Sequence, residues 1–98
     1  MYPDWATNMD WNSKMKVPPQ VMWRAIGEET VLLNLERGLY FGLDEVGARI
    51  WELLAAEKSF PEIASVVAGE YDVNIEQVRS DLIEFIGTLV EKGLLEKT

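Results

Sequence analysis

The chain has 98 residues, no cysteine, no histidine and a formal net charge of −8. This length supports one domain with a modest core, and an apolar share of 48% excludes a wholly disordered chain. The missing cysteine and histidine exclude zinc, haem and Cys–His nucleophilic sites and leave only carboxylate chemistry or hard-cation binding. We expect no metal and no cofactor. Most of the negative charge falls within residues 44–98, which favours cationic partners and repels nucleic acid.

Targeting signals are not apparent in the sequence. No apolar run approaches the roughly 20 residues that span a bilayer, and residues 1–5 lack the basic start and apolar stretch of a secretory signal. We therefore expect a cytoplasmic protein without a membrane partner.

Residues 1–16 show no sustained period and are predicted to form a flexible N-terminal arm, with residues 17–98 forming the domain. Trp5, Met9, Trp11 and Met15 are scattered among polar residues of this arm. Exposed aromatic surface is unfavourable unless it docks. Two interpretations stay open: a disordered end, or an arm that packs on the domain or on a neighbour.

A three-stranded antiparallel sheet is predicted next. Pro18 and Pro19 exclude a helix and a central strand where they stand, and Gly27 and Gly38 mark the following turns. The strands between these breaks are predicted at residues 20–26, 30–35 and 39–42.

Three helices follow the sheet. Asp44 is a good N-cap for the first, Ser59 and Glu62 have capping-box spacing at the second, and Asn74 begins the third, which Gly93 ends. The predicted ranges are 44–56, 61–70 and 74–92. The chain is thus predicted to be α+β, with a winged helix-turn-helix-like order of three strands and three helices.

The third helix has an unusually broad apolar surface. At 100° per residue, its apolar positions cover an arc of about 160°, compared with about 100° for an ordinary surface helix. Only Arg79 interrupts the arc, which consists of Ile75, Val78, Leu82, Ile83, Phe85, Ile86, Leu89 and Val90. Either the whole arc is core, or part of it borders a groove.

Two function classes are disfavoured by the residues. A winged-helix transcription regulator would present the polar face of the third helix to DNA, but this face carries only acids among its charged residues: Glu76, Asp81, Glu84 and Glu91. For an enzyme, the sequence has no histidine that could activate a serine nucleophile, and it has no Gly-rich phosphate-binding loop. Adjacent acids such as Glu28 and Glu29 point in different directions, so we expect no enzyme.

Peptide binding at a strand edge is the remaining function. In a meander the third strand lies at an edge and leaves backbone groups unpaired. An extended peptide could add there as a further strand while its alternate side chains contact the third helix. Ordering a peptide residue costs ~1–2 kcal/mol and a hydrogen bond returns ~0.5–1.5 kcal/mol. Apolar anchors must therefore provide the affinity.

Five stretches of the sequence form a familiar pattern: residues 31–35 (Val-Leu-Leu-Asn-Leu), 38–44 (Gly-Leu-Tyr-Phe-Gly-Leu-Asp), 46–54 (Val-Gly-Ala-Arg-Ile-Trp-Glu-Leu-Leu), 81–82 (Asp-Leu) and 89–95 (Leu-Val-Glu-Lys-Gly-Leu-Leu). With these stretches the sequence resembles the PqqD-like family over about residues 20–96. The likeness is most specific at residues 43–51, where many members have Asn in place of Asp44.

The resemblance implies a recognition element for ribosomally synthesised, post-translationally modified peptides. Such members bind the leader segment of a precursor as an added strand between the third strand and the third helix. Residues 40–42 and 46–51 look most like the free-standing proteins of lasso-peptide biosynthesis, which present the precursor to a leader peptidase. The alternative is the pyrroloquinoline quinone pathway's version, whose partner is a radical SAM enzyme. The resemblance leaves open whether the working form is a monomer or a dimer.

The resemblance also implies roles for particular residues. Strand pairing falls on Arg37, Leu39, Tyr40, Phe41 and Gly42. Groove lining falls on Val78, Arg79, Leu82, Ile83, Phe85 and Ile86, without distinguishing those that face the peptide from those that face the core. Gly47 and Trp51 are expected to be structural, the glycine by allowing close helix approach and the tryptophan by filling the core.

Overall fold

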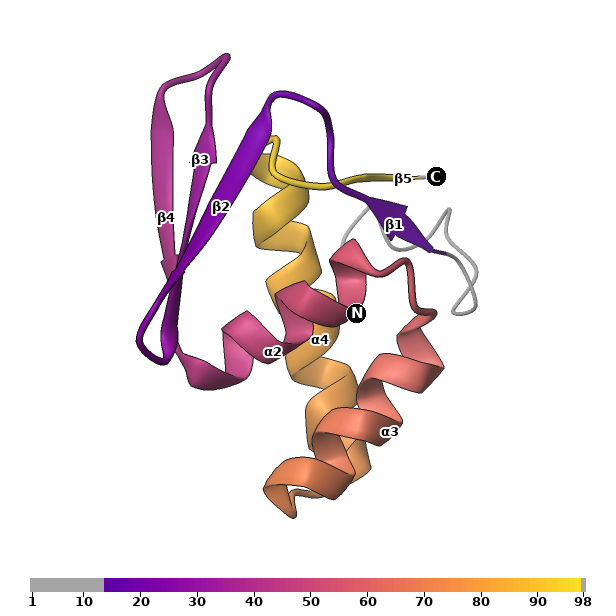
Figure 1. The fold of residues 1–98 in the computed structure, drawn as a ribbon. Helices are drawn as coiled ribbons and strands as arrows, with labels where there is room; N and C mark the ends of the chain where they lie inside the picture. The colour runs from indigo at the N-terminus through magenta and orange to yellow at the C-terminus, as the bar shows by residue number, and fades with distance from the viewer. Residues whose placement is uncertain (1–13, 98) are drawn as a thin grey trace.

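The computed structural model describes residues 14–97. Within them an antiparallel sheet precedes three helices (Figure 1). The elements in chain order are β1 (Met15–Lys16), β2 (Val21–Ile26), β3 (Glu29–Asn34), β4 (Leu39–Leu43), α2 (Glu45–Ala55), α3 (Phe60–Tyr71), α4 (Ile75–Glu91) and β5 (Glu96–Lys97). The predicted α+β class is confirmed, and each predicted strand and helix is present with ends that differ by at most one residue.

The sheet is a meander in the order β2-β3-β4, with all neighbours antiparallel. Its register pairs Leu32 of the central strand with Trp23 on one side and with Phe41 on the other. Side chains alternate between the two faces of a strand. On β3 the buried side chains are Thr30, Leu32 and Asn34, and α2 contacts both β3 and β4. The helices thus cover the face to which Leu32 points.

The N-terminal boundary differs from the prediction. Met15 and Lys16, the last two residues of the predicted arm, form β1 and pair with Lys97 and Glu96 of β5. Met15 is 1% exposed and belongs to the core, so these two residues pack with the domain. The rest of the predicted arm, including Trp5, Met9 and Trp11, lies outside the described residues.

Local signals set the helix starts. The Asp44 carboxylate accepts a hydrogen bond from the Gly47 backbone N–H at 2.8 Å, which caps α2 as expected. Ser59 donates from its backbone N–H and its hydroxyl to Glu62, which lowers the pKa of the Glu62 carboxyl. At α4 the Asn74 side chain accepts from the Glu76 N–H at 2.8 Å. In the same first turn, the Gln77 side-chain amide donates to Asp81 at 2.9 Å.

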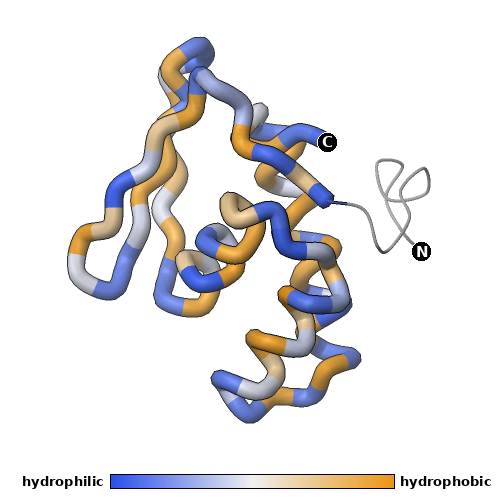
Figure 2. Tube along the Cα trace, turned by 45° about the vertical axis from the view of Figure 1, so that its right-hand side comes forward, coloured by the Kyte–Doolittle hydropathy of each residue, from blue (hydrophilic) through white to orange (hydrophobic). Residues whose placement is uncertain are grey.

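The core lies between the helix-covered face of the sheet and the three helices. In Figure 2 hydrophobic and hydrophilic stretches alternate along the helices, as expected for amphipathic segments that each bury one side. Trp51 is 1% exposed, as predicted, and its ring meets Trp23 edge-on at a centroid distance of 5.5 Å. Leu94 and Leu95, which follow α4, are also buried. The ring contact joins α2 to β2, and the segment that follows α4 packs into the core.

Candidate peptide-binding site

The outer edge of β4 has no neighbouring strand within residues 14–97, and the hydrogen-bond pattern shows which groups face it. The Leu35 N–H donates to the Gln20 carbonyl at 2.9 Å, and the Gly38 N–H donates to the Asn34 carbonyl at 2.8 Å. Consecutive residues of a strand direct their backbone groups to opposite sides. Because Asn34 therefore faces β4 and pairs with Leu39, the N–H and C=O of Tyr40 face the open edge.

The same alternation places Gly42 at this edge and divides the side chains of β4. Leu39, Phe41 and Leu43 point to the helix-covered face, and their exposure decreases from 41% at Leu39 to 4% at Leu43. Tyr40 points to the opposite face and is 75% exposed. A guest strand on this edge would hydrogen-bond at Tyr40 and Gly42. The guest residues opposite Leu39, Phe41 and Leu43 would then point towards the helices.

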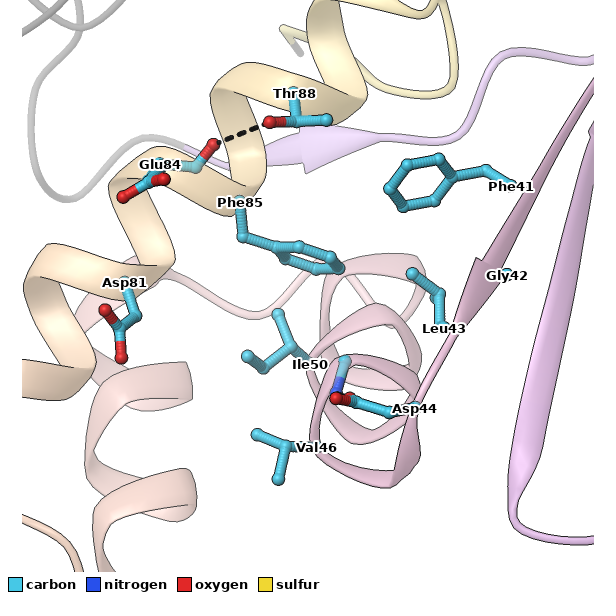
Figure 3. A pocket seen from close by; sticks show the side chains of 11 residues that line it. Phe41, Gly42, Leu43, Asp44, Val46, Ile50, Asp81, Glu84, Phe85 and Thr88 are labelled. Atoms are coloured by element: carbon cyan, nitrogen blue, oxygen red, sulfur yellow. Dashed lines mark hydrogen bonds between the residues drawn. The ribbon is translucent and has the colours of Figure 1, made fainter.

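A groove of about 430 Å³ opens beside this edge, between β4, α2 and α4 (Figure 3). Its apolar surface comes from all three elements, and the Phe85 ring of α4 points across it towards β4. Three carboxylates share the lining, and none of the lining residues is basic. The lining consists of Phe41, Gly42, Leu43, Asp44, Val46, Gly47, Ile50, Asp81, Glu84, Phe85 and Thr88.

The turn from β4 into α2 forms one end of the groove. Asp44 is held by its cap bond to Gly47, and a Cβ at Gly47 would lie 3.3 Å from the Asp44 carboxylate and 3.5 Å from Leu43 Cβ. The close approach expected at this glycine is therefore made to its own N-cap rather than to another helix. Val46, which is 38% exposed, and the more buried Ile50 continue the wall along α2.

The other end is fixed by a tie between the β3–β4 turn and the C-terminus of α4. The Asn34 amide donates to the Gly93 carbonyl at 3.0 Å and to the Lys92 carbonyl at 3.3 Å. Its oxygen accepts from the backbone N–H groups of Glu36 and Arg37. Because Asn34 is 1% exposed, these bonds also satisfy a buried polar group. They hold α4 at a set distance from the β4 edge.

Gly93 and Arg37 complete this tie. Gly93 has a φ of 70°, and a Cβ there would lie 2.8 Å from the Asn34 amide nitrogen. The Arg37 guanidinium donates to the Glu91 carbonyl at 3.0 Å, near the negative end of the α4 dipole. Arg37, for which strand pairing was implied, thus lies in the turn before β4 and contacts α4.

The implied groove residues of α4 separate into three groups. Phe85 lines the groove, as do Phe41 and Gly42 of β4. Val78, Leu82 and Ile86 are at most 5% exposed and belong to the core. The others lie outside the lining: Ile83 is half-buried, and Arg79 is exposed with its guanidinium 3.7 Å from Glu76.

Several lining residues were not among those singled out. Asp81, Glu84 and Thr88 belong to the polar face of the third helix. The helical period alone predicted that this face is exposed to solvent. The available signal was that these polar residues lie within one turn of Phe85. Residues on one turn of a helix border the same surface, so a groove at Phe85 would include them. Val46 and Ile50, which form the wall from α2, were not singled out either.

An ion pair between two helices lies outside the groove. Arg49 of α2 meets Glu70 of α3 through two nitrogen–oxygen contacts of 2.9 Å. The hydrogen bond raises the pKa of the Arg49 guanidinium and lowers that of the Glu70 carboxyl. Neither residue lines the groove, so this pair joins two helices and leaves the site untouched.

Within residues 14–97, no group of three or more Asp, Glu, His or Cys side chains could hold a metal ion. None of the helices in this part of the chain has the length and apolar character needed to cross a membrane.

Comparison with known proteins adds independent evidence. Residues 29–95 match the family model described as "Coenzyme PQQ synthesis protein D (PqqD)". The solved structure "TbiB1 in Complex with the TbiA(beta) Leader Peptide" is 44% identical, with a TM-score of 0.79 over 83% of this chain and 94% of that one. "Lasso peptide synthetase B1 complexed with the leader peptide" has the same TM-score at 23% identity, over 85% and 98% of the two chains. This second likeness concerns the fold alone. No curated protein matches the sequence.

Proposed function

The chain belongs to the PqqD family, and from this premise we propose that it binds the leader segment of a ribosomally synthesised precursor peptide, as a strand added to β4. The observation that carries the proposal is the open β4 edge beside an apolar groove. The edge supplies backbone partners at Tyr40 and Gly42, and the groove receives side chains of the guest. The 44% identity to a protein solved with a leader peptide supports the same function.

The affinity of such a guest depends on its apolar anchors. Strand hydrogen bonds return ~0.5–1.5 kcal/mol each, which roughly offsets the ~1–2 kcal/mol needed to order each residue. An anchor that fills the space between Phe41 and Phe85 gains ~1.5–3 kcal/mol. Two or three anchors on alternate guest residues give a usable affinity.

We further propose that the bound leader is delivered to a leader peptidase or another modifying enzyme, as in lasso-peptide biosynthesis. The domain contributes recognition and no bond-making step, so its effect is to raise the local concentration of precursor at the enzyme. The match to the coenzyme PQQ synthesis protein D family favours an alternative partner, a radical enzyme of the coenzyme pathway. The reading frames that neighbour the gene distinguish the two.

Titration with peptides tests the binding proposal. The probes are the TbiA(beta) leader peptide and the N-terminal segments of short reading frames beside the gene. We expect saturable one-to-one binding of at least one probe. If none of them binds, the proposal is wrong.

Tyr40 provides the test of strand addition. Tyr40→Pro removes the N–H that faces the open edge. It should weaken binding by roughly 2- to 12-fold, which is the equivalent of one hydrogen bond. Tyr40→Ala keeps this N–H and should bind like the wild type. Circular dichroism melting checks that both variants fold, since proline is tolerated at a sheet edge. Equal affinity of the two variants would contradict pairing at this residue.

A further inference from the structure

The groove is acidic at the end where β4 leads into α2. Asp44 lies on the β4 side, and Asp81 and Glu84 lie across from it on α4 (Figure 3). Their bonds within residues 14–97 are to neutral groups: Asp44 accepts from the Gly47 N–H, and Asp81 accepts from the Gln77 amide. No cation in this part of the chain neutralises the Glu84 carboxylate. Three carboxylates therefore belong to the lining of the groove, and no basic residue does.

A positive charge lies beside Phe41, outside the residues that line the groove. The Lys92 ammonium lies 5.6 Å from the centroid of the Phe41 ring, on the wall to which a guest residue near Leu39 would point. Glu91 is the neighbouring acid, but it projects about 100° round the helix from Lys92. The nearby charge is thus positive beside Phe41, from Lys92, and negative where Asp44 joins the lining.

The register of a guest strand relates these charges to positions in its sequence. Antiparallel pairing continues the pattern of the sheet and is slightly more stable per residue than parallel pairing. In this direction, the guest residue opposite Leu43 comes two positions before the residue opposite Phe41. Both side chains point towards the helices, because their partners on β4 do.

We propose that the guest carries a lysine or arginine two residues before the apolar anchor that packs between Phe41 and Phe85. This inference rests on the proposed function and adds a specificity rule to it. The aliphatic stem of such a residue packs along Val46 and Ile50, while its cationic head reaches Asp81 and Glu84.

Other side chains at this position are disfavoured. An apolar residue would cover the carboxylates without pairing them, which carries a desolvation penalty. An acidic residue would be repelled by all three carboxylates. A shifted or reversed peptide would place its basic residue near Lys92 instead of near the carboxylates. Lys92 would repel this cation, so such a binding mode is disfavoured.

Selection from a displayed library of random short peptides tests the rule. The wild type should enrich a large apolar residue preceded, two positions earlier, by lysine or arginine. Asp81→Asn combined with Glu84→Gln should enrich the same apolar pattern without the basic residue. The matched control, Glu76→Gln combined with Glu91→Gln, removes the same charge from α4 outside the groove and should keep the basic preference.

Titration of one selected peptide gives a second readout. Replacing its basic residue by methionine should weaken binding to the wild type about 5-fold at low salt, and less at high salt because the pair is partly exposed. The same replacement should leave the affinity of the Asp81→Asn, Glu84→Gln variant unchanged.

The outcomes separate the two proposals. Apolar enrichment without a basic preference overturns the specificity rule and leaves leader binding intact. A basic preference that persists in the Asp81→Asn, Glu84→Gln variant also overturns the rule, because it then comes from charge elsewhere. If no apolar pattern is enriched by any variant, the proposed function itself is wrong and the rule falls with it.

Discussion

The two sides of α4 are both apolar in part, but they have different surroundings. Val78, Leu82 and Ile86 are at most 5% exposed and belong to the core formed with the other helices. A short way round the helix, Phe85 is half-buried and stands among Asp81, Glu84 and Thr88 on the groove wall. The breadth of the apolar arc thus has two causes: one part closes the core, and another borders an open site.

Truncation on the core side should have the largest effect. Leu82 is fully buried, so Leu82→Ala removes apolar contacts and leaves a cavity. We expect the free energy of unfolding to fall by about 2–5 kcal/mol, measured by urea denaturation. A loss below 1 kcal/mol would mean that this side of α4 is not packed as described.

Truncation on the groove side should affect binding more than folding. Phe85→Ala removes a ring that lines the groove, and we expect leader affinity to fall by about 1.5–3 kcal/mol, or roughly 10- to 150-fold. Its effect on unfolding should be smaller than that of Leu82→Ala, because the ring is half-exposed.

Ile83→Ala is the matched control for the groove side. Ile83 is also half-buried on α4 but does not line the groove, so its truncation should leave leader affinity unchanged. Calorimetric titration of both variants measures the difference. Equal losses at Phe85 and Ile83 would remove the distinction between the two surfaces.

The fold was predictable from the sequence because its signals are local. Asp44, Ser59 and Asn74 cap helices through bonds within their own first turn, and Gly38 and Gly93 take the positive φ that their turns require. Which face of β3 is buried was not predictable. Thr30, Leu32 and Asn34 point inwards, although the alternate residues are the more hydrophobic.

The site was predictable only in outline. The edge strand and the third helix follow from element order, but Phe85 and Leu82 are distinguished by packing between elements rather than by their period. The acidic part of the groove lining on α4 was not predicted for the same reason, since Asp81 and Glu84 have the sequence pattern of solvent-exposed residues. Asn34 bonds to Lys92 and Gly93, which follow it by 58 and 59 positions in the chain. No local signal reveals such a contact.

Asn34 allows a test of whether the groove depends on the position of α4. Asn34→Ala removes its bonds to the turn and to α4, and should lower the free energy of unfolding by about 1–2 kcal/mol. Asn34→Asp keeps the acceptor for the Glu36 and Arg37 N–H groups but loses the donor to the Lys92 and Gly93 carbonyls.

Comparison of these two variants isolates the contact with α4. If the tie sets the groove width, both variants should bind leader peptide more weakly than the wild type in fluorescence titrations at a temperature where both are folded. Full affinity in Asn34→Asp would show that the core side alone positions the helix.

The smallest expected effect concerns the Arg49–Glu70 pair, which joins α2 to α3 outside the groove. Its hydrogen bond lowers the pKa of Glu70 below the ordinary value of 4.5, so the folded state binds fewer protons there than the unfolded chain. The stabilisation is therefore fully present above pH 4.5 and disappears as pH falls through the lowered pKa. Glu70→Gln should be slightly less stable than the wild type at neutral pH, and the two melting curves should converge in acid. Leader affinity should stay equal at neutral pH, because the core and groove sides of α4 are unchanged; a weaker complex would mean that the α2–α3 contact also shapes the groove.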